Sequence, residues 1–239
     1  MRGQAFILLL DASGAAVLGV NMAPGQRQAI SWMNGVPVSA LFDDPFYSFQ
    51  DGWAESAHVF LAGNDLPARL TDGFHVAELG FGTGLNLALL LSSWDGPGTM
   101  IYTAFEAYPL VGSDVRRALI RFPDAAPYIG LICALLKDGR VQTENARLEL
   151  VFGDARTAMP AWTGSADAWF LDGFAPQRNP ELWGAELMAE VARHTCSGGT
   201  FATYTAAGEV RRALSAAGFE VTRTAGFGRK RHMSRGVLR

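Results

Sequence analysis

Cysteine is scarce in this chain: Cys133 and Cys196 are the only two among 239 residues, and they lie far apart in the sequence. Two distant cysteines offer no disulfide framework and fit a reducing compartment, so we expect a cytoplasmic protein. The four histidines show no metal-ligand spacing, and the neighbouring His194 and Cys196 form only an incidental pair. We therefore expect no metal site.

Long apolar runs are also missing. No uninterrupted apolar stretch approaches the roughly 18–20 residues needed to cross a bilayer, which predicts no membrane-spanning segment. The segment Phe6–Leu10 follows Arg2 and is similar to the core of a short signal peptide, but Asp11 interrupts it. We expect an edge strand or a misplaced start codon here in preference to a signal peptide.

Acidic residues are absent from the end of the chain. All 23 of them lie at or before Glu220, although the net charge of the whole chain is −3. The residues that follow include these basic ones: Arg223, Arg229, Lys230, Arg231, Arg235 and Arg239. A basic end on an acidic body is either a phosphate-binding patch or a solvated surface strand, and the charge pattern alone leaves both open.

The length and composition fit one α/β domain with a modest extension. Hydrophobic residues make up 49% of the chain and charged residues 18%, as in ordinary globular proteins. Residues 1–70 are irregular, with turn signals at Asn34-Gly35, Asp43-Asp44-Pro45 and Asp51-Gly52 and a β-prone piece at Phe46–Phe49. We expect a small β-rich extension over 1–70, on the substrate side of the main domain over 71–239.

From residue 74 onward, strands alternate with helices. The expected strands are 74–79, 100–105, 148–152, 166–171, 200–204, 219–224 and 234–238, and the expected helices are 85–91, two within 110–136, 181–194 and 207–217. This order predicts a Rossmann-like, mostly parallel seven-stranded sheet with helices on both faces. Ligands bind outside the carboxyl ends of such strands, where Gly80, Glu106, Asp154 and Asp172 fall.

A glycine-rich turn follows the first of these strands and reads Glu78-Leu-Gly80-Phe-Gly82-Thr-Gly84. Glycines let a nucleotide-like cofactor approach the backbone, although glycine at a strand–helix turn is often only a turn. Residue 85 is leucine, so the G-x-G-x-x-G fingerprint of dinucleotide-binding oxidoreductases is incomplete. An acidic residue before the first glycine is instead typical of methyltransferases that bind S-adenosylmethionine.

Two further carboxylates strengthen this interpretation. Glu106 ends the second strand, where a carboxylate can accept hydrogen bonds from both ribose hydroxyls. Asp154 follows the third strand and is placed either to accept from an adenine amino group or to cap the helix that starts near Ala155, and the two roles are compatible. The three positions together favour an S-adenosylmethionine-dependent methyltransferase.

Several segments closely resemble the methyltransferase domain of the MnmC/MnmD family, over about Phe42 to Leu238. They are Val76–Asn86, Asp167–Pro176 with Asn179-Pro180 and Trp183, Phe60–Pro67, Gly199–Thr203 and Gly226–Arg231. The resemblance implies a class I methyltransferase fold that converts 5-aminomethyl-2-thiouridine at the tRNA wobble position to its 5-methylaminomethyl form. In fused members a flavin-dependent oxidoreductase domain produces the amine, so the partners it implies are tRNA and such an oxidoreductase.

The resemblance also implies roles for individual residues. Asp172 is the catalytic candidate, as an acceptor that aims the amine lone pair and takes its proton, and it also lies on the cofactor side with Asn86. Phe174 and Pro176 supply an apolar wall and a stacking face for the uracil; the alternative is that Asp172 caps a loop and Phe174 belongs to the core. The other substrate candidates are Asn179 and, for phosphates, Arg229, Lys230 and Arg231.

Two other functions are compatible with the same residues. The chain could methylate a small-molecule amine, with the basic end as plain surface. It could also be a non-catalytic module that only binds the cofactor, although Asp172, Asn179 and Pro180 argue against lost chemistry. Asp43, Asp44, Tyr47 and Asp51 either line the substrate mouth or simply form turns.

Overall fold

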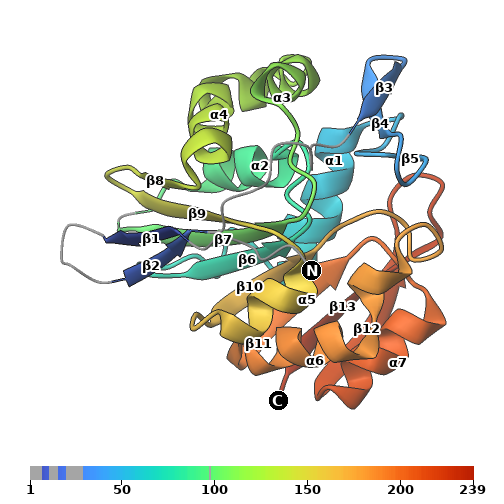
Figure 1. Cartoon of the computed structure of the whole chain (residues 1–239). Coiled ribbons are helices and arrows are strands. Elements are labelled where there is room, and N and C mark those ends of the chain that lie inside the picture. Colours follow the sequence, from blue (N-terminus) through green and yellow to red (C-terminus); the bar gives the residue numbers. More distant parts are fainter. Residues whose placement is uncertain (1–6, 11–15, 20–28, 97) are drawn as a thin grey trace, which may run out of the picture.

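The computed structural model describes residues 7–10, 16–19, 29–96 and 98–239, which form three sheets and their covering helices (Figure 1). For Phe6–Leu10 we expected an edge strand or a misplaced start codon; Ile7–Leu10 forms β1 and pairs antiparallel with β2 (Ala16–Gly19), and Phe6 lies outside the described residues. A small sheet of β3, β4 and β5 follows, and an eight-stranded sheet forms the centre. Among the described residues, we find no helix with the length and apolar character of a membrane span.

The central sheet contains all seven expected strands. Its order is β12-β13-β11-β10-β6-β7-β9-β8. Neighbours among β11, β10, β6, β7 and β9 pair in parallel, whereas β13 is antiparallel to both β11 and β12. The eighth strand, β8, was not expected and pairs antiparallel with β9 at the edge. The bounds are β6 His75–Leu79, β7 Met100–Glu106, β8 Arg140–Gln142, β9 Ala146–Phe152, β10 Ala166–Leu171, β11 Thr195–Thr203, β12 Phe219–Ala225 and β13 His232–Leu238.

Helices cover both faces of this sheet, as expected, because side chains of each strand alternate between two apolar cores. Along β10, Ala168 and Phe170 belong to one core and Trp169 and Leu171 to the other. Figure 1 shows α1 to α4 on the first face and α5 to α7 on the second. Their bounds are α1 Gly52–Ser56, α2 Leu85–Ser93, α3 Gly112–Leu119, α4 Ile129–Asp138, α5 Ala155–Ala158, α6 Ala185–Arg193 and α7 Gly208–Ala216, with a 3-10 segment at Pro123–Tyr128 before α4 and another at Pro180–Trp183 before α6.

The region before residue 70 differs from the expectation. The strands β3 (Ile30–Met33) and β4 (Val36–Ser39) meet at the expected Asn34-Gly35 turn, where both residues have positive φ, 51° and 75°. The β5 strand is only Asp44–Pro45, and a strand at Phe46–Phe49 was wrong because this piece forms bends under the glycine loop.

Helical structure over 52–64 was not expected. The Asp51-Gly52 signal starts a helix: the Asp51 side chain accepts from the Ala54 amide and caps α1. A π-helical turn (Ala57–Leu61) and a 3-10 turn (Ala62–Asn64) follow, and Phe60 packs on Phe170 of the central sheet with ring centroids 5.4 Å apart. Apolar burial therefore overrides the irregular local sequence. The division of the chain at residue 70 remains a prediction.

The strand order places a switch point between β6 and β10. After β6 the chain continues to β7 and β9 on one side, then crosses to β10 and β11 on the other. The connections that leave the carboxyl ends of β6 and β10 therefore diverge, and a ligand can enter between them. Gly80 and Asp172 are the first residues after these two strands.

Candidate active site at the carboxyl edge of the sheet

A cavity of about 990 Å³ opens at this switch point. That volume lies at the upper end of the range for small-molecule sites, roughly 300–1,000 Å³. Ten of the residues proposed from sequence line it: Gly80, Gly82, Asn86, Glu106, Asp154, Asp172, Phe174, Asn179, Arg229 and Lys230. Residues that are separated by up to 150 positions in the chain therefore meet around one space.

The glycine loop forms one wall of the cavity. Gly80, Gly82 and Gly84 have φ values of 81°, 53° and 75°, in the left-handed region that glycine adopts without strain. A Cβ on Gly80 would lie 3.1 Å from the carbonyl oxygen of Asp172, so a side chain here would push the two switch-point strands apart. Gly84 lies deeper, as the N-cap of α2, and is not part of the cavity wall.

Glu106 is held at the end of β7 by backbone amides. Its Oε2 accepts from the Gly82 N–H at 2.9 Å and its Oε1 from the Tyr108 N–H at 2.7 Å. Burial raises the pKa of this carboxyl, and the amide hydrogen bonds oppose that rise. Each carboxylate oxygen retains acceptor capacity, so Glu106 can accept further hydrogen bonds from a polar ligand in the cavity.

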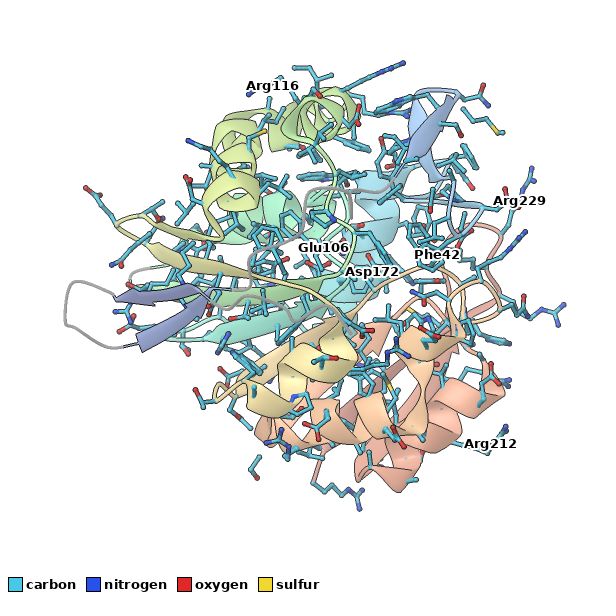
Figure 2. The ribbon with its side chains drawn as sticks, viewed as in Figure 1. Phe42, Glu106, Arg116, Asp172, Arg212 and Arg229 are labelled. Carbon is cyan, nitrogen blue, oxygen red and sulfur yellow. The ribbon has the colours of Figure 1, made fainter. Side chains whose placement is uncertain are left out.

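Asp172 follows β10 and lines the same cavity as Glu106, and Figure 2 labels both residues. The Gly173 N–H donates to its Oδ1 at 2.8 Å and the Asn86 side-chain amide donates to its Oδ2 at 2.8 Å. Burial raises the pKa of Asp172 to about 6, against the effect of these hydrogen bonds and of the Lys230 ammonium. A carboxyl with this pKa is ionised at neutral pH and binds a proton more readily than a surface aspartate.

Glu78 lies behind the cavity and not in its wall. Its carboxyl is fully buried and accepts from Asn86 Nδ2 at 2.6 Å and from the Tyr102 hydroxyl. Burial and the nearby Asp172 raise its pKa well above the usual range. Glu78 was expected on the cofactor side, but this geometry gives it a supporting place, since it fixes the Asn86 amide that reaches Asp172.

Asp154 is the N-cap of α5, which is one of the two roles expected for it. Its side chain accepts from the Arg156 N–H at 2.9 Å at the start of α5, and the Arg156 guanidinium bridges Asp154 to Glu181. The hydrogen bond from Arg156 is the main cause that lowers the Asp154 pKa. Because Asp154 also lines the cavity, its contact with an adenine ring remains a prediction.

Aromatic rings surround the mouth of the cavity. Phe42 stacks on Phe174 with centroids 4.7 Å apart, and Phe46 meets Phe174 edge-on at 5.1 Å. Tyr108 and Phe49 also line the cavity and are 37% and 45% exposed, unusually open for large apolar side chains. Pro176 is buried outside the lining, so Phe174 belongs to an aromatic cluster at the mouth and Pro176 does not.

The small N-terminal sheet and α1 carry residues that the sequence left unassigned. Asp44 Oδ2 accepts from the Ala175 N–H at 2.8 Å, and Asp44 and Tyr47 line the cavity, whereas Asp43 pairs with Arg178 and Asp51 caps α1. Phe42, Phe46, Glu55 and Tyr204 were missed as site residues. For Glu55 a signal existed: it is the only acidic residue between Gly52 and Asn64.

The basic loop between β12 and β13 reaches the same cavity. Lys230 pairs with Glu55 Oε1 at 2.8 Å and lies 4.3 Å from the centroid of the Tyr204 ring. Figure 2 shows Arg229 at the outer edge of the molecule, on the same side as Phe42. Arg231 is exposed and outside the cavity lining. The three basic residues therefore occupy different positions.

Known proteins resemble this chain in sequence and fold. A family described as S-adenosyl-L-methionine-dependent methyltransferase matches residues 130–239. Two relatives bear the name tRNA 5-methylaminomethyl-2-thiouridine biosynthesis bifunctional protein MnmC. The one from Caulobacter sp. strain K31 is 43% identical over 83% of this chain and 36% of its own length, and that from Caulobacter vibrioides is 42% identical over 88% and 38%.

This chain thus spans little more than a third of the length of the curated relatives it matches. A crystal structure of MnmC2 from Aquifex aeolicus aligns with 90% of this chain and 72% of its own, with a TM-score of 0.73 and 24% identity. That likeness concerns the fold, which it shares with the present structure.

Proposed function

This chain belongs to the family of S-adenosylmethionine-dependent methyltransferases that includes the methyltransferase part of MnmC, and on that premise we propose that it methylates the amine of 5-aminomethyl-2-thiouridine in tRNA. The product is the 5-methylaminomethyl nucleoside. The observation that carries the proposal is one cavity that combines a glycine loop, a half-buried acceptor at Asp172 and an aromatic mouth.

The residues of this cavity fit the cofactor. Gly80 and Gly82 have no side chain, so the backbone of the loop is open to a ligand. Both have positive φ values, which other residues adopt only with strain. Glu106 is fixed by two amides and keeps the acceptor capacity that a ribose needs. Asp154 would face the adenine amino group from the next strand end, so three neighbouring strands contribute to one site, as in other α/β folds.

When bound, S-adenosylmethionine supplies an electrophilic methyl group on a sulfonium. Attack by the amine nitrogen on this methyl carbon would break the carbon–sulfur bond, with S-adenosylhomocysteine as the leaving group that keeps the electron pair. The nitrogen then loses a proton, which the Asp172 carboxylate accepts. Alignment supplies most of the rate, since holding reacting atoms near 3–3.5 Å is worth roughly 7–11 kcal/mol.

The amine must be neutral to attack. If its pKa resembled that of lysine, about 10.4, neutralising it at pH 7 would cost roughly 4–5 kcal/mol. A carboxylate alone would increase the free-energy cost of neutralising the amine, because it stabilises the ammonium form. Asp172 is more useful as an oriented acceptor: Asn86 and Gly173 fix its two oxygens, so the free lone pairs point in a defined direction.

The aromatic mouth favours a nucleoside over a small aliphatic amine. Flat rings of Phe42, Phe174 and Tyr108 give a base a surface on which to stack, and stacking on an aromatic side chain contributes about 1–3 kcal/mol per base. Arg229 at the outer edge would contact the phosphates on either side of that base. A target base inside a folded RNA loop must turn outward to enter such a cavity.

Methyl transfer to purified substrates tests the proposal. The chain and labelled S-adenosylmethionine are incubated with tRNA that carries 5-aminomethyl-2-thiouridine, and the nucleosides are analysed by mass spectrometry. We expect conversion of that nucleoside to its methylated form. Transfer to small amines with none to tRNA would support a small-molecule enzyme. Cofactor binding by calorimetry without transfer to either would support a non-catalytic binding module.

The amine itself must come from another reaction. We propose that a flavin-dependent oxidoreductase removes a carboxymethyl group from the modified uridine and so supplies the substrate, in the cytoplasm where tRNA is modified. The relatives are named bifunctional proteins, which supports a second activity close to this one. Omission of that oxidoreductase from a reconstituted system should leave the carboxymethyl form unmethylated.

A further inference from the structure

One lysine of the basic loop faces the site of chemistry. Lys230 lies between β12 and β13, yet its ammonium is 2.8 Å from Oε1 of Glu55 on α1 and 4.3 Å from the ring centroid of Tyr204 after β11. Glu55 is 8% exposed, so this ion pair is shielded on the carboxylate side. A phosphate contact alone would not require a buried partner, because phosphates approach from solvent.

The same residues connect to Asp172 through short contacts. The Tyr204 hydroxyl donates to the Gly173 carbonyl at 2.8 Å, and the Gly173 N–H donates to Asp172 Oδ1 at 2.8 Å. Gly173 has a φ of 144°, a conformation that favours glycine. The Tyr204 ring therefore supports Lys230 on its face and the Asp172-Gly173 turn through its hydroxyl.

The charges that face Asp172 are of both signs. Lys230 lowers the pKa of Asp172 and Glu55 raises it, and of these two charges Lys230 has the larger effect. Glu78 and Tyr102 lie behind Asn86, and Glu106 and Asp44 line the cavity. Three arginines also line it: Arg156, which pairs with Asp154 and Glu181; Arg178, which pairs with Asp43; and Arg229. Lys230 is the cation whose charge lowers the pKa of Asp172.

We propose that Lys230, paired with Glu55 over the Tyr204 ring, is a positioning residue that keeps the Asp172 carboxylate ionised and makes the cavity select the neutral form of the substrate amine. A cation beside the acceptor site disfavours an ammonium there, which offsets the opposite effect of Asp172. This inference rests on the proposed function for its substrate, but the state of Asp172 can be measured without any substrate.

Titration of Asp172 tests the inference directly. The chain is labelled with ¹³C at the aspartate carboxyls, and the Asp172 signal is assigned by its loss in Asp172→Asn. Lys230→Met leaves Glu55 unpaired near Asp172, so the titration midpoint should rise, by at least roughly half a pH unit. Glu55→Gln leaves Lys230 uncompensated, so the midpoint should fall. Lys230→Arg keeps the charge and should restore the wild-type midpoint.

These opposite shifts distinguish charge from packing. A purely structural ion pair would be disturbed equally by Lys230→Met and Glu55→Gln, and shifts of the same sign, or none, would overturn the inference. Arg229→Met removes a cation from the adjacent position of the loop and is the matched control for general surface charge. If Arg229→Met shifted the titration midpoint of Asp172 as much as Lys230→Met does, that result would also overturn the inference.

The pH dependence of methyl transfer supplies the second measurement. We expect the acid limb of the kcat/KM profile to move to higher pH in Lys230→Met and to lower pH in Glu55→Gln, with KM for tRNA changed much less than kcat in both. If wild-type protein transfers no methyl to tRNA, the proposed function fails, and the titration still decides whether Lys230 keeps Asp172 ionised. If transfer occurs and the acid limbs do not move, Lys230 does not keep Asp172 ionised during catalysis. If the rise in activity above neutrality, which follows the substrate amine, stays at the same pH in Lys230→Met, the selection of neutral amine fails.

Discussion

The side-chain amide of Asn86 donates to Oδ2 of Asp172 at 2.8 Å and thereby joins the helix after the glycine loop to the end of β10. The same nitrogen reaches Oε1 of Glu78 at 2.6 Å. One amide thus serves two carboxyls, one fully buried and one at the cavity wall. The helix after the glycine loop, Glu78 and Asp172 are therefore coupled through a single side chain.

Replacement of Asn86 by alanine should affect both stability and pH dependence. Loss of the amide leaves the buried Glu78 carboxyl and the half-buried Asp172 carboxyl each short of a donor, which costs roughly 1–3 kcal/mol of unfolding free energy. The Asp172 pKa should rise further, because the hydrogen bond from Asn86 lowers it. Chemical denaturation and the acid limb of kcat/KM measure the two effects. Asn145→Ala on the exposed surface is the control, and equal effects of both variants would contradict this coupling.

Asp172→Asn tests proton acceptance by the site. The amide keeps one acceptor oxygen but cannot take a proton, so the single-turnover rate should fall roughly 10²–10⁴-fold. Affinity for the cofactor and tRNA should change little, because the proton moves near the transition state. Asp167→Asn alters the other end of β10, where Oδ2 accepts from the His75 N–H, and should retain activity. Near wild-type rates for Asp172→Asn would leave Asp172 as an orienting residue only.

The wild-type enzyme should lose activity on the acid side of neutrality. The pKa of Asp172 is raised to about 6, so the carboxylate needed to accept a proton disappears as pH falls through that value. Above it, activity should continue to increase as more of the substrate amine becomes neutral. Measurement of kcat/KM from about pH 5 to about pH 9 should show both phases. A profile without a decline near pH 6 would mean that Asp172 does not titrate in the rate-limiting state.

Local sequence patterns were sufficient for seven of the eight strands of the central sheet and for one wall of the candidate site. Alternating apolar strands and the glycine turn predicted β6 and the loop after it, and the strand ends placed Glu106, Asp154 and Asp172 around one cavity. These features depend on short-range periodicity and on the position of strand ends in a parallel sheet. Both can be read from consecutive residues.

The opposite wall of the cavity could not be predicted from local patterns, because contacts between residues far apart in the sequence form it. Phe42 meets Phe174 across 132 positions of sequence, and Glu55 meets Lys230 across 175. A charge run predicted a common phosphate-binding role for Arg229, Lys230 and Arg231, because sequence does not show that Lys230 has a buried partner. The short edge strand β8 was missed for a similar reason: only its pairing with β9 defines it.

Gly82→Val should abolish binding of S-adenosylmethionine. Gly82 has a φ of 53°, its N–H donates to Glu106, and a Cβ would lie 3.2 Å from the Phe46 ring. A β-branched residue strains this backbone and fills the loop that should face the cofactor. Gly73→Val is the matched control, since Gly73 has a φ of 77° and open space around its Cβ position. Calorimetry should show lost affinity in the first variant alone; undiminished binding by Gly82→Val would refute the cofactor assignment.

The exposed arginines of the basic loop should set the salt dependence of tRNA binding. Arg229 and Arg231 lie in the loop beside the cavity mouth, whereas Lys230 is held by Glu55 and so is left unchanged in this test. Each arginine that neutralises a phosphate releases counterions, so the double variant Arg229→Ala, Arg231→Ala should lower the slope of log Kd against log salt by about one per lost contact.

Arg212→Ala on α7 removes an arginine that lies well away from Arg229 in Figure 2 and should leave the slope unchanged. Cofactor affinity should stay constant in all of these variants, because none touches the glycine loop or Glu106. An unchanged slope in the double variant, or an equal reduction in Arg212→Ala, would mean that the loop carries no phosphate contact of its own.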